Sequence, residues 1–169
     1  MAQAAQGGDA IDIVYIGNPV MDITVSDPER DIMGRYSLEL GMASLVTPEQ
    51  MPIYDELWAR EDKLVSPGGS ALNSARAQMH ANPQGSVGYF GCIGNDPMGR
   101  SLTEAVTAAN ILGKFEISEE ECTSRCATVI VNRERTLCAH IASARKFSNQ
   151  YLEANMVSHI SESHNPHYG

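Results

Sequence analysis

The chain has little positive charge, which argues against one broad class of function. Lysine and arginine together number 12 against 21 aspartates and glutamates, so the formal net charge of the 169 residues is −9. A protein that binds nucleic acid needs a basic face for the phosphate backbone. We therefore expect no nucleic-acid partner, and the acidity favours solubility instead.

Signals for secretion or for membrane insertion are also missing. The first eight residues, MAQAAQGG, contain neither a basic region nor an apolar one, and no apolar run is long enough to span a bilayer. We expect a cytoplasmic protein with no membrane partner. Reduced cysteines are the default in that compartment.

Cysteine and histidine are too sparse to form a familiar metal site. Cys122 and Cys126 make one spaced pair, but no second pair completes a zinc site. Cys92 and Cys138 lie in apolar, strand-like runs, where a free cysteine acts as a small buried hydrophobe. Three histidines cluster near the end of the chain at a spacing that fits no metal centre: His159, His164 and His167. We expect this chain to contribute no metal ligands.

Strands and helices are predicted to alternate through the middle of the chain. The hydrophobic content of 43% and the charged content of 20% are ordinary for a globular protein, and the length suits one domain. Apolar runs predict buried strands over residues 11–17 and 87–94, with a helix over about 70–80 between them. A further helix is expected over about 98–109, closed by Gly113. This alternation predicts an α/β fold with a right-handed parallel crossover and helices outside the sheet.

A second group of short strands is predicted apart from that alternation. Residues 22–25 are β-prone, and residues 126–131 and 135–141 form two strands joined by a polar turn. Beyond them, Ser148 is expected to cap a last helix.

One more helix is predicted after residue 47. Residues 47–50 read Thr-Pro-Glu-Gln, in which the threonine and the glutamine form a capping box and the proline suits the first turn. Pro52 places the true helix start a few residues later. Three large side chains then fall on one face, which we expect to point into the core: Met51, Tyr54 and Trp58.

Residues 67–73, Pro-Gly-Gly-Ser-Ala-Leu-Asn, are the most informative stretch. Two glycines end an extended segment, and a helix then opens with small and polar side chains. Glycine permits φ > 0 and lets a ligand approach the main chain closely, while a helix start offers unpaired N–H groups and a partial positive charge. Asn73 on the first turn is placed to reach a hydroxyl-rich ligand. The alternative is a helix entered through an ordinary glycine turn.

Three segments together resemble the PfkB (ribokinase-like) family of carbohydrate and nucleoside kinases. Residues 17–22 read Gly-Asn-Pro-Val-Met-Asp, residues 68–73 read Gly-Gly-Ser-Ala-Leu-Asn, and residues 91–96 read Gly-Cys-Ile-Gly-Asn-Asp. Each motif alone is common, but the three in this order and at this spacing are specific. The resemblance extends over about residues 11–160.

The resemblance implies how the chain is organised. It implies an α/β fold, a partial ribokinase-like three-layer sandwich with a small β lid built from about residues 22–45 and 126–141. Residues 1–10 would be a flexible leader, residues 11–164 the N-terminal part of a kinase domain, and residues 165–169 an irregular tail.

The resemblance also implies roles for single residues. Ribose would be held by an acidic side chain, two asparagines and the glycine loop: Asn18, Asp22, Gly68, Gly69, Ser70 and Asn73. The nucleobase would pack against an apolar wall: Cys126, Leu137, Ala139 and Ile141. Arg135 would stabilise negative charge on the transferred phosphoryl group.

Residue types alone leave other interpretations open for these positions. Asp22 could be an ordinary turn aspartate. The alternating apolar residues of 137–141 could simply face the core. Arg135 could be a solvated turn arginine, and Arg133 is its neighbouring competitor.

The implied activity is transfer of a phosphoryl group from ATP, with Mg²⁺, to adenosine or a related nucleoside. The 169 residues do not contain the family's second motif, Asp-Thr-x-Gly-Ala-Gly-Asp, whose last aspartate is the general base and whose glycines form an anion hole. Most residues that bind ATP and Mg²⁺ would therefore lie outside this chain, and the chain alone is predicted to be inactive. The alternative is a non-catalytic module that binds nucleoside or serves as a structural component of a larger assembly, with a protein partner covering the incomplete sheet.

Overall fold

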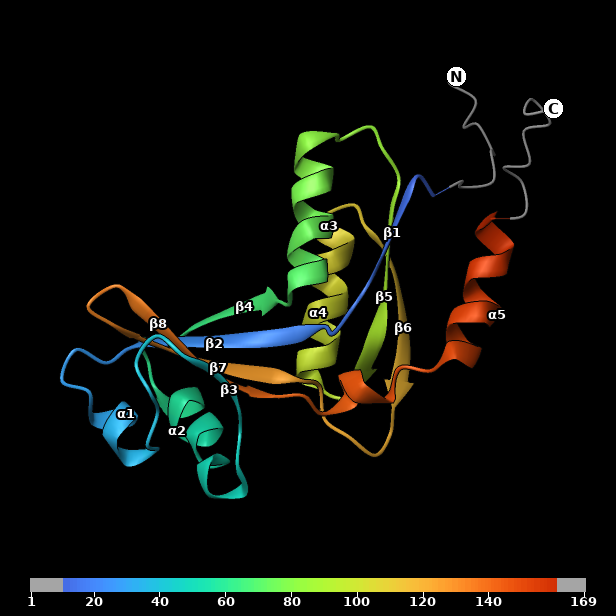
Figure 1. The fold of residues 1–169 in the computed structure, drawn as a ribbon. Helices are drawn as coiled ribbons and strands as arrows, with labels where there is room; N and C mark the ends of the chain where they lie inside the picture. The colour runs from blue at the N-terminus through green and yellow to red at the C-terminus, as the bar shows by residue number, and fades with distance from the viewer. Residues whose placement is uncertain (1–10, 161–169) are drawn as a thin grey trace.

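The structure, a computed structural model, describes residues 11–160 and contains two β-sheets (Figure 1). The first sheet has three parallel strands: β1 (Ile13–Ile16), β5 (Val87–Gly94) and β6 (Leu112–Ser118), in the order β1-β5-β6. Two helices, α3 (Ser70–Ala81) and α4 (Pro97–Ala108), pack their apolar sides against β5 and form one hydrophobic core. This arrangement confirms the predicted α/β fold with parallel strands.

The β5 strand and the α3 helix agree with the prediction from sequence. Every residue of β5 is buried, as the continuous apolar run indicated. The α3 helix begins at Ser70, directly after Gly69. The first sheet therefore has its central strand and one covering helix where the sequence places them.

Two predictions about the first sheet are wrong. The β1 strand is shorter than residues 11–17 and is not fully buried, since Ile13 and Ile16 are 37% and 46% exposed at the edge of the sheet. Gly113 does not close α4. It lies inside β6, a strand that was not predicted, and a Cβ there would lie 2.9 Å from Cγ1 of Val106.

The second sheet has five strands in the order β3-β8-β7-β2-β4. Their bounds are β2 (Val20–Ser26), β3 (Ala43–Leu45), β4 (Leu64–Gly68), β7 (Arg125–Val131) and β8 (Glu134–His140). The β2 and β7 strands are parallel, whereas β4 pairs antiparallel with β2 and β8 with β7. Residues 22–45 and 126–141 supply most of four strands, and β4, from outside both segments, is the fifth.

Two short helices lie on one side of the second sheet: α1 (Asp31–Arg35) and α2 (Ile53–Ala59) (Figure 1). The predicted capping box is present before α2, where a 3-10 turn (Pro48–Gln50) precedes the helix and the Thr47 N–H donates to Oε1 of Gln50 at 3.0 Å. Side chains from the sheet and both helices form the second hydrophobic core, which includes Ile23, Tyr54 and Val129.

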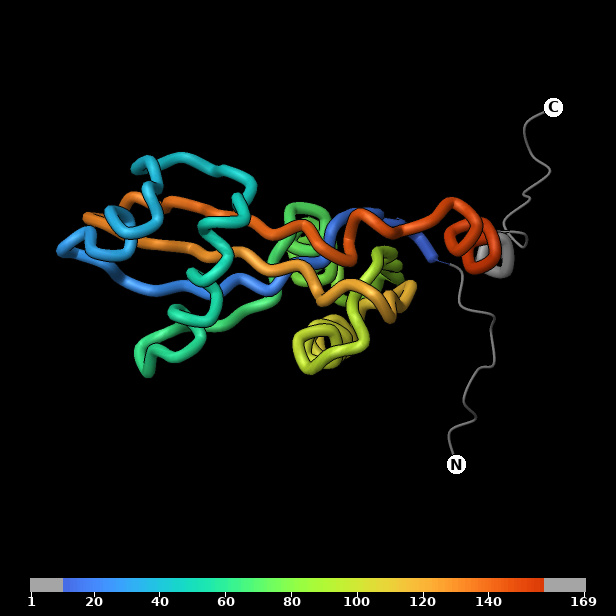
Figure 2. The backbone as a smooth tube through the Cα atoms, turned by 90° about the horizontal axis from the view of Figure 1, so that it is seen from below, coloured from blue at the N-terminus to red at the C-terminus, as the bar shows by residue number. Residues whose placement is uncertain are grey.

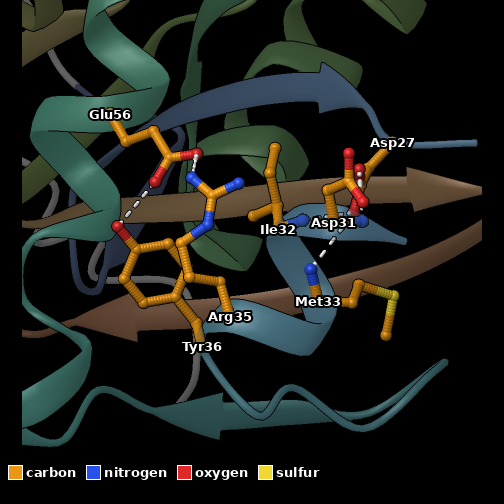
Figure 3. A network of polar contacts seen from close by, with 7 residues as sticks. All are labelled: Asp27, Asp31, Ile32, Met33, Arg35, Tyr36 and Glu56. Carbon is orange, nitrogen blue, oxygen red and sulfur yellow. Dashed lines mark hydrogen bonds and ion pairs between the residues drawn. The ribbon is translucent and has the colours of Figure 1, made fainter. Parts of the chain in front are cut away.

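The Asp27 side chain holds the first turn of α1, a helix that was not predicted. Its buried carboxylate accepts hydrogen bonds from the backbone N–H groups of Asp31, Ile32 and Met33, at 3.0–3.1 Å (Figure 3). One side chain therefore satisfies three donors that the first turn would otherwise leave unpaired.

Glu56 joins α2 to the end of α1. Its carboxylate accepts from the Arg35 guanidinium at 2.6 Å and from the Tyr36 hydroxyl at 2.7 Å (Figure 3). Burial and the hydrogen bond to Glu56 raise the pKa of Tyr36 to about 12. These bonds fix the two helices to each other beneath the sheet.

The predicted core stripe on α2 is partly wrong. Tyr54 is fully buried and Met51 packs against the core, but Trp58 is 46% exposed. The Nζ atom of Lys63 lies 5.4 Å from the centre of the Trp58 ring. Trp58 borders a cavity together with Met21 and Val65 instead of packing into the core.

The two sheets lie end to end along the long axis of the molecule (Figure 2). The second sheet with α1 and α2 occupies one end, and α3, α4 and α5 (Asn149–Ile160) lie toward the other. Ser148 caps α5 as predicted, because its Oγ accepts from the Tyr151 N–H at 3.0 Å. Within residues 11–160, no helix has the length and apolar character needed to cross a membrane. The predicted leader (1–10) and tail (165–169) are outside the described residues.

Candidate functional site

The side of the second sheet that faces away from α1 and α2 carries five of the predicted site residues. Paired residues of neighbouring strands point to the same side, and successive residues alternate. Asp22 pairs with Cys126, and Cys126 with Ala139; one step along, Thr128 pairs with Leu137. Arg135 belongs to the same alternating set of β8. We call this side the site face, and Figure 1 shows no helix over it.

The site face is separate from both hydrophobic cores. The core side of the same strands is formed by the alternate residues, among them Ile23, Ala127 and Cys138. Leu137 and Ala139 are half-buried and belong to neither core. The alternative that these residues simply face the core is therefore wrong.

Glycine at position 68 makes room for the Asp22 carboxylate. A Cβ at Gly68 would lie 2.6 Å from Cγ of Asp22, closer than real Cβ atoms approach other heavy atoms. Gly69 has a φ of 99°, and a Cβ there would collide with the backbone carbonyl oxygen of Asn18. The two motifs around residues 18–22 and 68–69 are therefore in direct contact, although they are far apart in the sequence.

The electrostatics of Asp22 depend on two neighbours. Burial raises the pKa of the Asp22 carboxyl, and the positive charge of Arg135 partly opposes that rise. Arg135 is exposed and lies on the site face, whereas Arg133 occupies the β7–β8 turn with a φ of 71°. Of the two competing arginines, Arg135 is the one whose positive charge acts on the pKa of Asp22.

Cys126 is a buried thiol beside Asp22. Burial, with a smaller contribution from the negative charge of Asp22, raises the pKa of Cys126 to about 11. The thiol is therefore neutral at pH 7 and forms an apolar part of the site face.

The remaining predicted residues lie just before or after the strands that form the site face. Ser70 and Asn73 are exposed on the first turn of α3, and the Asn73 N–H donates to the Gly69 carbonyl at 2.9 Å. The side chain of Asn73 borders a cavity of about 530 Å³ between α3 and α4, and within residues 11–160 it has no hydrogen-bond partner. Asn18 is exposed, and Ile141 follows the last residue of β8.

Sequence reasoning missed several residues of the site face. Leu64 of β4 and Leu45 of β3 lie on it and are each 70% exposed, and Ser66 pairs with Asp22. Only the strand register assigns them to this side. The sequence predicts only an extended segment before the glycine loop, and only the structure shows that this segment belongs to the second sheet as β4.

The site face is an open surface and not an enclosed cavity. A cavity of about 800 Å³ lies between α4 and the ends of β5 and β6, and none of the predicted site residues borders it. In the described part of the chain, no three histidines, cysteines or carboxylates come together as metal ligands would.

Comparison with known proteins gives a consistent result. The sequence profile of the pfkB family of carbohydrate kinases matches residues 44–168. The chain is 29% identical to an adenosine kinase of Schizophyllum commune over 85% of this chain and 41% of that protein. It is 30% identical to adenosine kinase 2 of Arabidopsis thaliana over 83% of this chain and 41% of that protein.

Solved structures show the same likeness. An adenosine kinase of Anopheles gambiae, in complex with P1,P4-di(adenosine-5) tetraphosphate, matches with a TM-score of 0.80 and 29% identity, over 85% of this chain and 43% of that one. An adenosine kinase of Schistosoma mansoni in complex with adenosine matches with a TM-score of 0.77 and 26% identity, over 86% and 42%. The chain thus spans less than half the length of these relatives.

Proposed function

The chain belongs to the pfkB family of carbohydrate kinases, and from that premise we propose that it forms the acceptor-binding part of an adenosine kinase. Such an enzyme transfers the terminal phosphoryl group of ATP to the 5′-hydroxyl of adenosine. The observation that carries the proposal is the Asp22 carboxylate, seated against Gly68 and beside Cys126 on the site face.

Asp22 would bind the ribose. A carboxylate accepts hydrogen bonds from two neighbouring hydroxyl groups at once, and charged acceptors form stronger bonds than neutral ones. The positive charge of Arg135 favours the ionised form of Asp22. Amide groups of Asn18 and Asn73 have no partner among residues 11–160 and would add donors and acceptors around the sugar.

The nucleobase would pack on the apolar side chains beside Asp22. Cys126, Leu137 and Ala139 form a continuous patch because β7 and β8 are neighbours in register, and Ile141 extends it. A flat purine buries its faces well on such a patch. The long side chain of Arg135 would reach the phosphoryl group and offset its negative charge.

Among residues 11–160, no group of three histidines, cysteines or carboxylates lies close enough together to hold a metal ion. We propose that the groups holding ATP and Mg²⁺ are mostly outside these 169 residues, as is the general base. The isolated chain would therefore bind adenosine without phosphorylating it. Purified chain incubated with adenosine, ATP and Mg²⁺ is expected to yield no AMP, and measurable turnover would refute this part of the proposal.

A second candidate function is a non-catalytic component of a larger assembly. The observation that favours it is the exposed apolar surface of Leu45 and Leu64 on the site face, which a protein partner would cover. The reading frame after Gly169 discriminates between the two functions. A downstream Gly-Ala-Gly-Asp motif favours the kinase, and a stop codon favours the component.

Calorimetric titration with adenosine tests the ribose site. The unaltered chain is expected to bind, and Asp22→Ala to weaken binding by about tenfold or more, because a charged hydrogen-bond acceptor is lost. Asp62→Ala is the matched control, since Asp62 is an exposed aspartate that pairs with Arg60 and is not on the site face. Equal affinity for all three chains would refute the assignment.

A further inference from the structure

Directly behind the site face, a cavity of about 420 Å³ opens on the other side of the sheet. Met21 and Arg125 are paired across β2 and β7 and point into this side, one residue before Asp22 and Cys126 on each strand. Most of the lining is apolar: Met21, Trp58, Val65, Pro97 and Met98. The volume falls within the range of about 300–1,000 Å³ that is typical of small-molecule sites.

Among the described residues, Arg125 is the one cationic residue that lines this cavity, and its hydrogen-bonding capacity is unused. Its guanidinium lies over the ring of Tyr54, with Cζ 4.4 Å from the ring centre. Stacking holds the planar group in place, yet the side chain donates no hydrogen bond to any of residues 11–160. An arginine fixed in this way is pre-organised to receive an acceptor.

The surroundings of Arg125 are also short of hydrogen-bond partners. In the described part of the chain, two buried side-chain nitrogens are without one: Nε of Arg125 and Nδ1 of His140. The two residues are directly paired across β7 and β8. Buried polar atoms without partners are rare in native proteins. His140 does not border the cavity, but Arg125 does, so its Nε is a donor that a polar ligand in the cavity would satisfy.

The charges around the cavity favour a ligand with a single negative charge. Arg125 and Lys63 are the nearby cations, and Lys63 lies over the Trp58 ring. Asp96 is the one acidic residue in the lining, and its carboxylate already accepts bonds of 2.7–2.8 Å from Thr123 and Gly99. A phosphate with two charges would be repelled by Asp96, whereas a carboxylate suits one guanidinium.

We propose that this cavity is a second binding site, separate from the site face, for a small aromatic carboxylate. The carboxylate accepts hydrogen bonds from the Arg125 guanidinium, and the aromatic ring packs against Trp58 and the two methionines of the lining. The free thiol of Cys122 also lines the cavity, and it is the one exposed cysteine of the four. Cys122 therefore reports whether the cavity is occupied.

The test uses 2-naphthoate as the probe and the neutral 2-naphthamide as its uncharged equivalent. Calorimetry on the full chain is expected to show that 2-naphthoate binds and that the amide binds at least about tenfold more weakly. Saturating 2-naphthoate is expected to slow the labelling of Cys122 by N-ethylmaleimide. Equal binding of the two probes, or unchanged labelling, would overturn the proposal.

Two variants locate the binding. Arg125→Gln is expected to weaken 2-naphthoate binding by about tenfold to a hundredfold, whereas Arg100→Gln, an exposed arginine outside this cavity, leaves it unchanged. Ser101→Phe fills the cavity from the exposed side of α4 and is expected to abolish binding. This second variant still tests the proposal if Arg125→Gln fails to fold. Undiminished binding by Ser101→Phe would place the ligand elsewhere.

Discussion

Replacing Gly68 with alanine tests the contact between the two motifs of the site face. The three atoms nearest to a Cβ at this position all belong to the Asp22 carboxyl group, with Cγ at 2.6 Å. Asp22 is a short side chain in a paired strand, so it cannot move away freely. Overpacking of this kind costs about 1–3 kcal/mol, and Gly68→Ala is expected to lower the free energy of unfolding by that amount.

A double-mutant cycle separates this clash from other effects of the substitution. Asp22→Ala removes all three atoms that the new Cβ would meet, so adding Gly68→Ala to it is expected to cost close to nothing. The coupling energy between the two positions would then be about 1–3 kcal/mol. Urea unfolding followed by circular dichroism gives each of the four values.

Gly34→Ala is the control, because a Cβ there meets no atom within 4 Å and Gly34 lies in α1. Alanine is the better helix former, so this variant is expected to be neutral or more stable by up to about 1 kcal/mol. If Gly68→Ala costs the same with and without the Asp22 carboxylate, the reasoning about the contact is refuted.

Three further predictions concern stability and thiol reactivity. Asp27→Ala leaves three N–H groups of α1 without an acceptor and is expected to cost about 1–2 kcal/mol in urea unfolding, with the exposed Glu61→Ala as a neutral control. Burial raises the pKa of Asp22 above its ordinary value of 3.8, so the folded chain holds the proton more tightly and ionised Asp22 lowers stability as pH rises through the folded pKa. Asp22→Asn should accordingly raise the urea midpoint at pH 7, and the gain should shrink as pH falls toward 4; a gain that grows on acidification would contradict this sign. Labelling with N-ethylmaleimide at pH 8 is expected to modify one thiol quickly, and Cys122→Ser to remove that phase, because the other three cysteines are buried with raised pKa values.

Local patterns predicted two elements that have a strong signal in their own sequence, β5 and α3. The β5 strand is apolar throughout because helices and neighbouring strands surround it, so its sequence alone indicates its place. The α3 helix follows a glycine pair that no strand or helix interior favours. In both cases the local signal and the tertiary environment agree.

Elements with weak local signals were missed for physical reasons. The α1 helix has five residues and depends on one carboxylate, Asp27, which any surface turn could also contain. In β6, Phe115 and Ile117 alternate with charged residues, a strand signal that the glycine before them obscured. Trp58 fits a helical stripe, but whether strands lie opposite it depends on the tertiary fold.

The candidate site shows the same division. The resemblance named Asp22, Gly68 and Cys126 as site residues, and these three lie next to one another in the structure. No spacing rule predicted that Ser66 and Leu64 join them, because the antiparallel register of β4 against β2 brings those residues to the site face. The sequence did not predict the cavity around Arg125 for a similar reason, because its lining residues come from several elements that are far apart in the chain.

The one-residue offset between Met21–Arg125 and Asp22–Cys126 limits how the chain can vary. A single insertion or deletion in the short connection between β1 and β2 would slip β2 by one position and exchange the two sides of the sheet. Met21 would then take the place of Asp22 on the site face, and the Asp22 carboxylate would be turned to the side of α2 and α4. The number of residues between β1 and β2 is therefore constrained by the residues on both sides of the sheet. The turn at residues 82–85 lies at the surface and can gain or lose residues.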